Sequence, residues 1–240
     1  MIEIYNEKQQ VYGEFNGGEI IENKPIGFPS EKGGTKAYSN LFYWAHAKAN
    51  IDSTIGLHPH KGFEIMSYVI NGSIKHYDTL IKKWKILNKG DVQIIQSGSG
   101  ISHSEAINKD SSIFQIWFDP NLEKSIFQKP KYKDYSSKKF KSNSSKKIII
   151  GNNSPVKINS EKIEIFELKL EENYIIESNL DQIISIYVLE GKLEICNNKL
   201  NKHDFLKIQK MNKIEIKIKE KTKLFCISSP KKTSYKTYIN

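Results

Sequence analysis

Short runs in which apolar and polar residues alternate recur along most of the chain. Residues 213–219 are the clearest case, because isoleucine fills every second position between charged residues. Side chains two apart point to the same side of a β-strand, so this pattern predicts a strand with one buried face. Only residues 121–127 have a pattern that predicts a helical turn or two. Further strand-like runs occupy residues 91–95, 112–118 and 223–228.

The strand pattern occurs twice. Residues 68–75 read as a strand, a glycine turn and a returning strand, and residues 187–194 resemble them. Residues 91–95 likewise resemble residues 204–208. Many short strands separated by turn residues are typical of sandwiches and barrels, and an internal repeat indicates two copies of one unit. We therefore expect an all-β chain with two tandem β-barrels.

The composition changes between residues 129 and 147. This stretch holds eight lysines, several serines and a single acid, Asp134, and it has no glycine. Such a composition is typical of a surface connection between domains. We expect an N-terminal barrel over residues 1–132, a Lys/Ser-rich linker over 133–147, and a C-terminal barrel with a tail over 148–240.

The charge of the chain is unusual in its makeup. The formal net charge is +10, and all 37 basic residues are lysine, since the sequence has no arginine. Specific nucleic-acid binding typically uses the bidentate guanidinium of arginine, whereas lysine alone gives a salt-sensitive attraction to polyanions. We therefore interpret the lysines as a solvated surface and expect no specific nucleic-acid partner.

The sequence also bears on the cellular compartment. No apolar run approaches the roughly eighteen residues that a membrane span needs, and residues 1–13 do not resemble a secretory signal. We expect a cytoplasmic protein without a membrane partner. Cys196 and Cys226 lie in apolar, strand-like runs, so we expect both to be buried free thiols and not a disulfide.

The first candidate site lies in residues 56–64. In an extended segment His58 and His60 direct two imidazoles to the same side, and Glu64 falls on the same phase. Pro59 between the histidines cannot donate a ladder hydrogen bond, which favours an edge or irregular strand. A lone His-x-His pair also occurs on ordinary surfaces, so the segment needs partners elsewhere.

A second pair, His103 and Glu105, follows a glycine-containing turn and is again spaced by two. Two such pairs on nearby strands of a barrel could converge in its interior. Imidazoles and a carboxylate suit Fe(II), Mn, Co, Ni, Cu or Zn better than Mg or Ca. We therefore expect one divalent transition metal ion. We interpret the remaining histidines as ordinary structural or surface residues: His46, His76 and His203.

Four segments together resemble the signature of pirins, a branch of the cupin superfamily. Motif order and spacing agree over about residues 40–120, and the weaker second half has a suitable length and repeat. The segments that carry the resemblance are 58–64, 90–93, 98–105 and 115–117.

The resemblance implies a bicupin, with two jelly-roll cupin barrels, whose N-terminal barrel binds iron, Fe(II), through three histidines and a glutamate. The ligands then correspond to His58, His60, His103 and Glu105. Cupins in general more often take the carboxylate from the Glu64 position, so Glu64 is the alternative ligand. The repeat places Glu177 and Asn179 at the His58 and His60 positions of the second barrel, which implies that this barrel has lost its metal site.

The resemblance also implies candidate functions. One is an iron-dependent quercetin dioxygenase, which acts on flavonols or other small aromatics with O₂. Glu105 or Glu64 would then accept the substrate proton, and the ring of Phe63, Trp44 or Tyr43 would line the substrate pocket. A second is a metal- or redox-sensing regulator that needs a protein partner. A third, a sugar-phosphate isomerase, fits the motifs less well. We expect a monomer.

Overall fold

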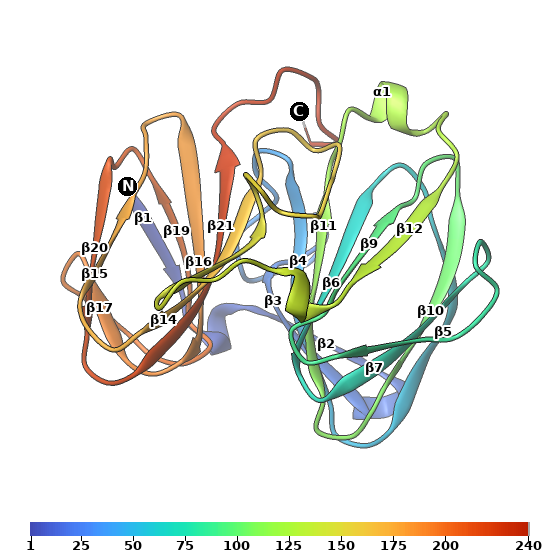
Figure 1. Cartoon of the computed structure of the whole chain (residues 1–240), viewed down its shortest axis with the longest axis horizontal. Helices are drawn as coiled ribbons and strands as arrows, with labels where there is room; N and C mark the ends of the chain where they lie inside the picture. The colour runs from blue at the N-terminus through green and yellow to red at the C-terminus, as the bar shows by residue number, and fades with distance from the viewer. Residues whose placement is uncertain (240) are drawn as a thin grey trace. The chain divides into compact units, whose positions relative to one another are not determined.

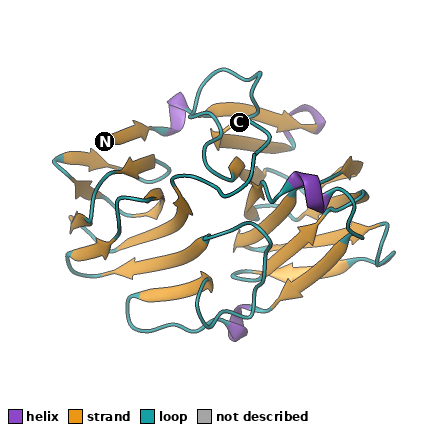
Figure 2. Cartoon of the chain, turned by 90° about the horizontal axis from the view of Figure 1, so that it is seen from above, coloured by secondary structure: helices purple, strands orange, loops and turns teal. Residues whose placement is uncertain are grey.

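The structure is a computed structural model that describes residues 1–239, and it is built almost entirely of antiparallel strands (Figures 1 and 2). Two compact units divide the chain. We call residues 10–139, with 158–161 and the segment from Ser234 onward, the N-terminal barrel. Residues 1–9, 140–157 and 162–233 form the C-terminal barrel. The all-β prediction is confirmed.

The N-terminal barrel consists of two sheets. The seven-stranded sheet contains, in order across the sheet, β12 (Lys131–Tyr135), β9 (Val92–Gln96), β6 (Glu64–Asn71), β11 (Ser112–Phe118), β4 (Leu41–Ala49), β3 (Ile20–Ile26) and β2 (Val11–Phe15). The four-stranded sheet contains β5 (Ser53–His60), β10 (Ile101–Ile107), β7 (Ser73–Asp78) and β8 (Lys85–Asn88). The predicted helical turn is the short helix α1 (Leu122–Ser125).

The C-terminal barrel has the same two-sheet construction. Its six-stranded sheet contains, in order, β1 (Ile2–Tyr5), β19 (Phe205–Gln209), β16 (Gln182–Glu190), β21 (Thr222–Pro230), β14 (Glu164–Leu170) and β13 (Lys146–Ile150). Its four-stranded sheet contains β15 (Tyr174–Glu177), β20 (Lys213–Ile218), β17 (Leu193–Ile195) and β18 (Asn198–Leu200). The four strand-like runs named from the sequence therefore form β20, β9, β11 and β21.

The first strand joins the barrel formed by the second half of the chain. β1 pairs along its whole length with β19, and Figure 1 shows it in blue beside strands in orange. Ile2 and Ile4 pack against the core of that barrel. The amino-terminal residues therefore do not belong to the unit that the sequence assigned to residues 1–132.

The expected linker over residues 133–147 contains strand residues at both ends. β12 pairs with β9 of the N-terminal barrel, and β13 pairs with β14 of the C-terminal barrel. In β12, Lys131 and Lys133 are exposed while Tyr132 packs in the interior with Ile95. Because lysines dominate this stretch, its composition resembles that of a surface loop, and the alternation of a strand is not evident from it. The division into domains at residues 132 and 147 stays a prediction.

The two cysteines differ in exposure. Both are free thiols, as expected, but Cys196 is exposed and only Cys226 is buried. Cys196 has a positive φ of 49° and lies in the turn between β17 and β18, where its side chain cannot follow the strand's inward face. No helix within residues 1–239 is long and apolar enough to cross a membrane.

Candidate metal centre

Three histidines converge inside the N-terminal barrel. β5 and β10 pair so that His103 lies directly opposite His58, and His60 follows two residues later on the same strand. The Nε2 atoms of His60 and His103 are 2.9 Å apart. One ring nitrogen of each of the three histidines lies within 4.8 Å of the others. The structure thus brings together the three histidines that the sequence singled out.

The local sequence of β5 explains how His58 is held. β5 is an edge strand of its sheet, as the proline at position 59 predicted. The β5–β10 ladder shifts register between His103 and Glu105, so β5 bulges just before His58. Here His58 Nδ1 lies 2.7 Å from the carbonyl oxygen of Gly56. A hydrogen bond from Nδ1–H to this carbonyl leaves Nε2 as the ring atom with a free lone pair.

Burial keeps two of the imidazoles neutral. Desolvation, with repulsion from His103 and His58, lowers the pKa of His60 from 6.5 to about 3. Desolvation, followed by repulsion from His58 and His76, lowers the pKa of His103 to about 3 as well. Metal ligands must be deprotonated. The chemistry of this donor set, with ring nitrogens converging on one point, therefore fits a transition metal ion.

Glu105 is next to this triad and is fully inside the barrel. Its side chain is buried, and its two carboxylate oxygens accept hydrogen bonds from Ser67 Oγ (3.0 Å) and Gln115 Nε2 (2.7 Å). A carboxylate oxygen also lies within 4.8 Å of a ring nitrogen of His103 and of His76. Glu105 is therefore grouped with His103 but not directly with His58 and His60.

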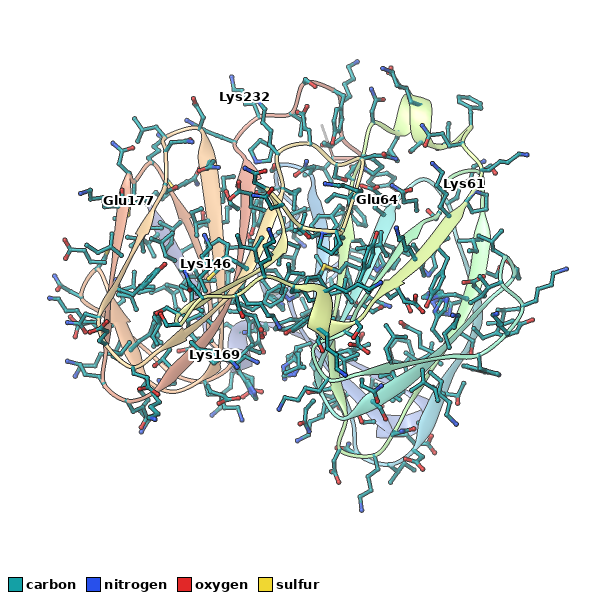
Figure 3. The ribbon with its side chains drawn as sticks, viewed as in Figure 1. Lys61, Glu64, Lys146, Lys169, Glu177 and Lys232 are labelled. Atoms are coloured by element: carbon teal, nitrogen blue, oxygen red, sulfur yellow. The ribbon has the colours of Figure 1, made fainter. Side chains whose placement is uncertain are left out.

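Glu64, the alternative carboxylate, has different partners. Its oxygens accept hydrogen bonds from Gln96 Nε2 (2.7 Å), from the backbone N–H groups of Asn159 (2.6 Å) and Ser160 (2.8 Å), and from Ser160 Oγ (2.7 Å). Within residues 1–239, potential metal ligands form two groups, one of His58, His60 and His103 and one of His76, His103 and Glu105. Glu64 belongs to neither group. Three of the four donors belong to Asn159 and Ser160, so Glu64, labelled in Figure 3, anchors the segment 158–161 to the start of β6.

His76 is a member of the site that the sequence interpretation missed. It is fully buried, its Nε2 lies 2.7 Å from Asp78 Oδ2, and its ring stacks on Tyr132 with centroids 4.6 Å apart. Its Nδ1 is buried without a hydrogen-bond partner. His76 lies directly opposite Glu105 in the β7–β10 ladder, and Asp78 opposite His103. The signal was a third pair spaced by two, His76 and Asp78.

Glu22 on β3 is a second buried acid that the sequence did not single out. Burial raises its pKa from 4.5 to about 7, while Lys24 and the Tyr43 hydroxyl act in the opposite direction and Glu105 adds repulsion. The Tyr43 hydroxyl lies 3.4 Å from its carboxylate. A carboxyl group that titrates near neutral pH therefore lies close enough to Glu105 to sense its charge.

Aromatic rings cover one side of the histidine cluster. Trp117 meets the His60 ring edge to face, with centroids 4.7 Å apart, and Phe63 lies 5.8 Å from Trp117. Tyr43 contacts Trp117 as well, whereas Trp44 is fully buried against Phe114 and does not join this group. An open hollow of about 470 Å³, lined by His60, lies beside the loop before β10. The cluster is therefore accessible at His60.

The ladders of the C-terminal barrel show what replaces this site. Counting from the matching turns at Gly72 and Gly191, β7 corresponds to β17, β10 to β20 and β5 to β15. Most positions of the polar layer, the inward-facing set around the histidines, then carry an apolar residue, whereas His60 corresponds to Ser178 and Asp78 to Asn197. His58 corresponds to Ile176, His76 to Ile195, His103 to Ile214, Glu105 to Ile216, Ser67 to Ile186 and Gln115 to Cys226.

The expected equivalence of His58 with Glu177 was wrong by one residue. Ile176 faces the core of its barrel, and Glu177 is exposed. A shift of one residue moves a strand's side chains to the opposite face. The isoleucines at positions 176, 195, 214 and 216 carry no metal-binding atom, while Cys226 stands in place of Gln115 and carries a thiol. The loss of the metal site from this barrel stays a prediction.

Comparisons with known proteins agree with this geometry. Residues 34–118 match the family described as Pirin. Pirin-1 of Arabidopsis thaliana is 42% identical over 82 residues, which cover 33% of this chain and 28% of that protein. Quercetin 2,3-dioxygenase of Escherichia coli is 41% identical over 69 residues, 27% of this chain and 29% of that protein. The chain matches only about a third of the length of its curated relatives.

Solved structures extend the similarity of fold to the whole chain. YhhW from Escherichia coli superposes with a TM-score of 0.83 at 22% identity, covering 96% of this chain and 98% of that one. The complex of the same bacterial pirin with nickel(II) gives 0.81 at 21% identity, covering 96% and 99%. The pirin resemblance over residues 34–118 and the fold of two tandem cupin barrels are confirmed.

The lowered histidine pKa values predict how the metal-free protein responds to acid. Below pH 6.5 the unfolded chain protonates both histidines, whereas folded His60 and His103 stay neutral down to about pH 3. The free energy of unfolding should therefore fall as the pH drops from about 6.5 toward 3, by about 1.4 kcal/mol per pH unit for each histidine. Urea unfolding with a chelator present measures this slope. The double variant His60→Gln, His103→Gln should lose it, and equal slopes in both proteins would contradict the account.

Proposed function

We propose that this chain binds one divalent transition metal ion through His58, His60, His103 and Glu105, and that it is a dioxygenase for quercetin-like flavonols or another small aromatic. The observation that carries the proposal is the convergence of three imidazoles, two of them held neutral by burial, beside a buried carboxylate. The name of the Escherichia coli relative, quercetin 2,3-dioxygenase, supports the reaction type.

The resemblance to pirins favours Fe(II), and the ligand set also suits Mn, Co, Ni, Cu or Zn. Nickel(II) occupies the bacterial pirin of similar fold. A bound ion with an open coordination position would supply positive charge for an ionised substrate oxygen and redox chemistry for O₂.

The residues around the cluster would position a flat substrate. The hollow beside His60 gives access from solvent, and Trp117, which packs on the His60 ring, lies next to Phe63. A flavonol ring stacked on these side chains would direct its hydroxyl toward the histidines. Removal of this hydroxyl proton requires a base within reach.

Two carboxylates are candidates to accept the hydroxyl proton of the substrate. Ser67 and Gln115 hold Glu105 next to His103, so we propose Glu105 as both ligand and proton acceptor. Glu64, which the sequence offered for both roles, already accepts four hydrogen bonds. We therefore propose a structural role for Glu64. A cytoplasmic location and a monomeric state are part of the same proposal.

The direct test is metal analysis combined with O₂ uptake. Protein loaded anaerobically with Fe(II) should hold about one equivalent and consume O₂ when quercetin is added in air. His58→Ala and His103→Ala should lose both metal and turnover. His203→Ala is the matched control, because His203 pairs with Glu7 in the C-terminal barrel, and this variant should behave as the wild type.

Other results would change the proposal in defined ways. Stoichiometric metal without turnover of quercetin or related aromatics would contradict the dioxygenase and favour the metal- or redox-sensing regulator. Absence of stoichiometric metal after loading would contradict the metal site itself.

The two glutamates should separate metal binding from folding. Glu105→Gln should weaken metal affinity more than about 10-fold, with a smaller effect on the stability of the metal-free protein. Glu64→Gln removes a buried charge from four donors and should lower the free energy of unfolding by about 2–4 kcal/mol, while the folded variant keeps its metal. Metal titration and urea unfolding of both variants measure the two effects. The reverse pattern would make Glu64 the ligand.

A further inference from the structure

The C-terminal barrel contains a pocket of about 260 Å³ at one end of its interior. Phe166, Ile176 and Ile184, which also belong to the barrel's core, form its apolar wall. Ser228 lies among them, and Lys146 and Glu177, both labelled in Figure 3, also line the pocket. The pocket lies within one barrel and needs nothing from the other.

The pocket occupies the position that corresponds to the mouth of the metal site in the other barrel. In the β6–β11 ladder Trp117 lies opposite Ile65, and in the β16–β21 ladder Ser228 lies opposite Ile184 at the matching position. Trp117 fills its place by packing on His60. Serine is much smaller than tryptophan, so the same place in the C-terminal barrel is left open.

The Ser228 hydroxyl has no partner within the described part of the protein. Its side chain is 3% exposed, and its Oγ makes no hydrogen bond. Along β21, Ser228 continues the inward-facing row that contains Leu224 and Cys226. A buried hydroxyl without a partner costs free energy, which a ligand with a donor or acceptor at this point would recover.

Charges around the pocket largely offset one another. Lys146 places its Nζ 4.0 Å from the centroid of the Phe166 ring, and Glu177 pairs with Lys213 at 3.8 Å. Glu164 is the other acid in the lining. This balance gives an anion or a cation no advantage over a neutral molecule. The volume is also below the roughly 300 Å³ at which pockets for drug-sized ligands begin, which limits the ligand to about a single ring.

We propose that the C-terminal barrel binds a small uncharged aromatic alcohol. Its ring packs against Phe166, Ile176 and Ile184, and its hydroxyl forms a hydrogen bond with Ser228. Isoleucines at the positions of His58, His76, His103 and Glu105 make this interior apolar, and its mouth stays open. This binding site is independent of metal in the N-terminal barrel.

The probe is para-fluorophenol, and the measurement is fluorine NMR line broadening with the full-length chain in the presence of a chelator. Phenols could also enter the histidine site, so the same titration is made in the variant His58→Ala, His103→Ala. We expect saturable binding in both proteins with equal affinity. Absence of binding, or its loss in the double histidine variant, would overturn the proposal.

Variants at β21 locate the binding. Ser228→Ala should weaken binding about 3- to 10-fold through the lost hydrogen bond, and Ser228→Leu, which fills the pocket, should abolish it. Ser229→Ala is the matched control, because Ser229 is also buried with an unpartnered hydroxyl but points to the other face of the strand. Circular dichroism confirms folding of each variant.

Two results would contradict the assignment. Equal affinity in Ser228→Ala, or weakening by Ser229→Ala as large as by Ser228→Ala, would place the probe elsewhere. Tighter binding of para-fluorobenzoate than of para-fluorophenol would contradict the choice of an uncharged ligand.

Discussion

Four imidazoles and a carboxylate lie together inside the N-terminal barrel, and all of them except His58 are buried. Two conditions allow the barrel to hold this layer of polar side chains in its interior. His60 and His103 must stay neutral, which burial and repulsion from neighbouring histidines favour. The carboxylate of Glu105 must have donors, which Ser67 and Gln115 provide. Buried polar groups that are only partly satisfied are costly, and an ion at this point would use the lone pairs that the protein leaves unpaired.

The two barrels show that this layer is not needed for the fold. Both have the same ladders, but the C-terminal barrel carries isoleucine where the other has His58, His103 and Glu105. The isoleucines belong to one continuous core. In the N-terminal barrel the comparable apolar cluster, around Val69 and Ile107, stops two residues short of the polar layer. Apolar alternation therefore stabilises this fold without the polar layer.

Much of the fold could be predicted from local sequence, because alternation and turn glycines act over a few residues. The strand at Lys213–Ile218 and the repeat around Gly72 and Gly191 are examples. The pairing of β1 with β19 could not be predicted, since it joins residues about two hundred positions apart. β12 was missed because its lysines dominate the composition of that stretch, although Tyr132 faces the interior.

The site was predictable to the extent that its residues are spaced by two on one strand. His58, His60 and His103 are brought together as that spacing indicated. His76 was missed, although it and Asp78 have the same spacing, because the sequence does not show that β7 lies beside β10. The repeat alignment placed Glu177 one residue out of register, because the connection from β15 to β16 is one residue longer than that from β5 to β6, and the sequence does not show this.

The central claim is that this inward-facing layer holds one metal ion on three imidazoles and the carboxylate of Glu105. X-ray absorption spectroscopy of the Fe(II)-loaded protein tests it most directly, because imidazole ligands give a distinct multiple-scattering pattern. The account predicts a first shell of nitrogen and oxygen with three imidazoles, which stays at three in Glu105→Gln loaded at higher Fe(II), whereas His58→Ala gives no such spectrum because it loses the metal. A spectrum with one imidazole or none, or one that His58→Ala leaves unchanged, would contradict it.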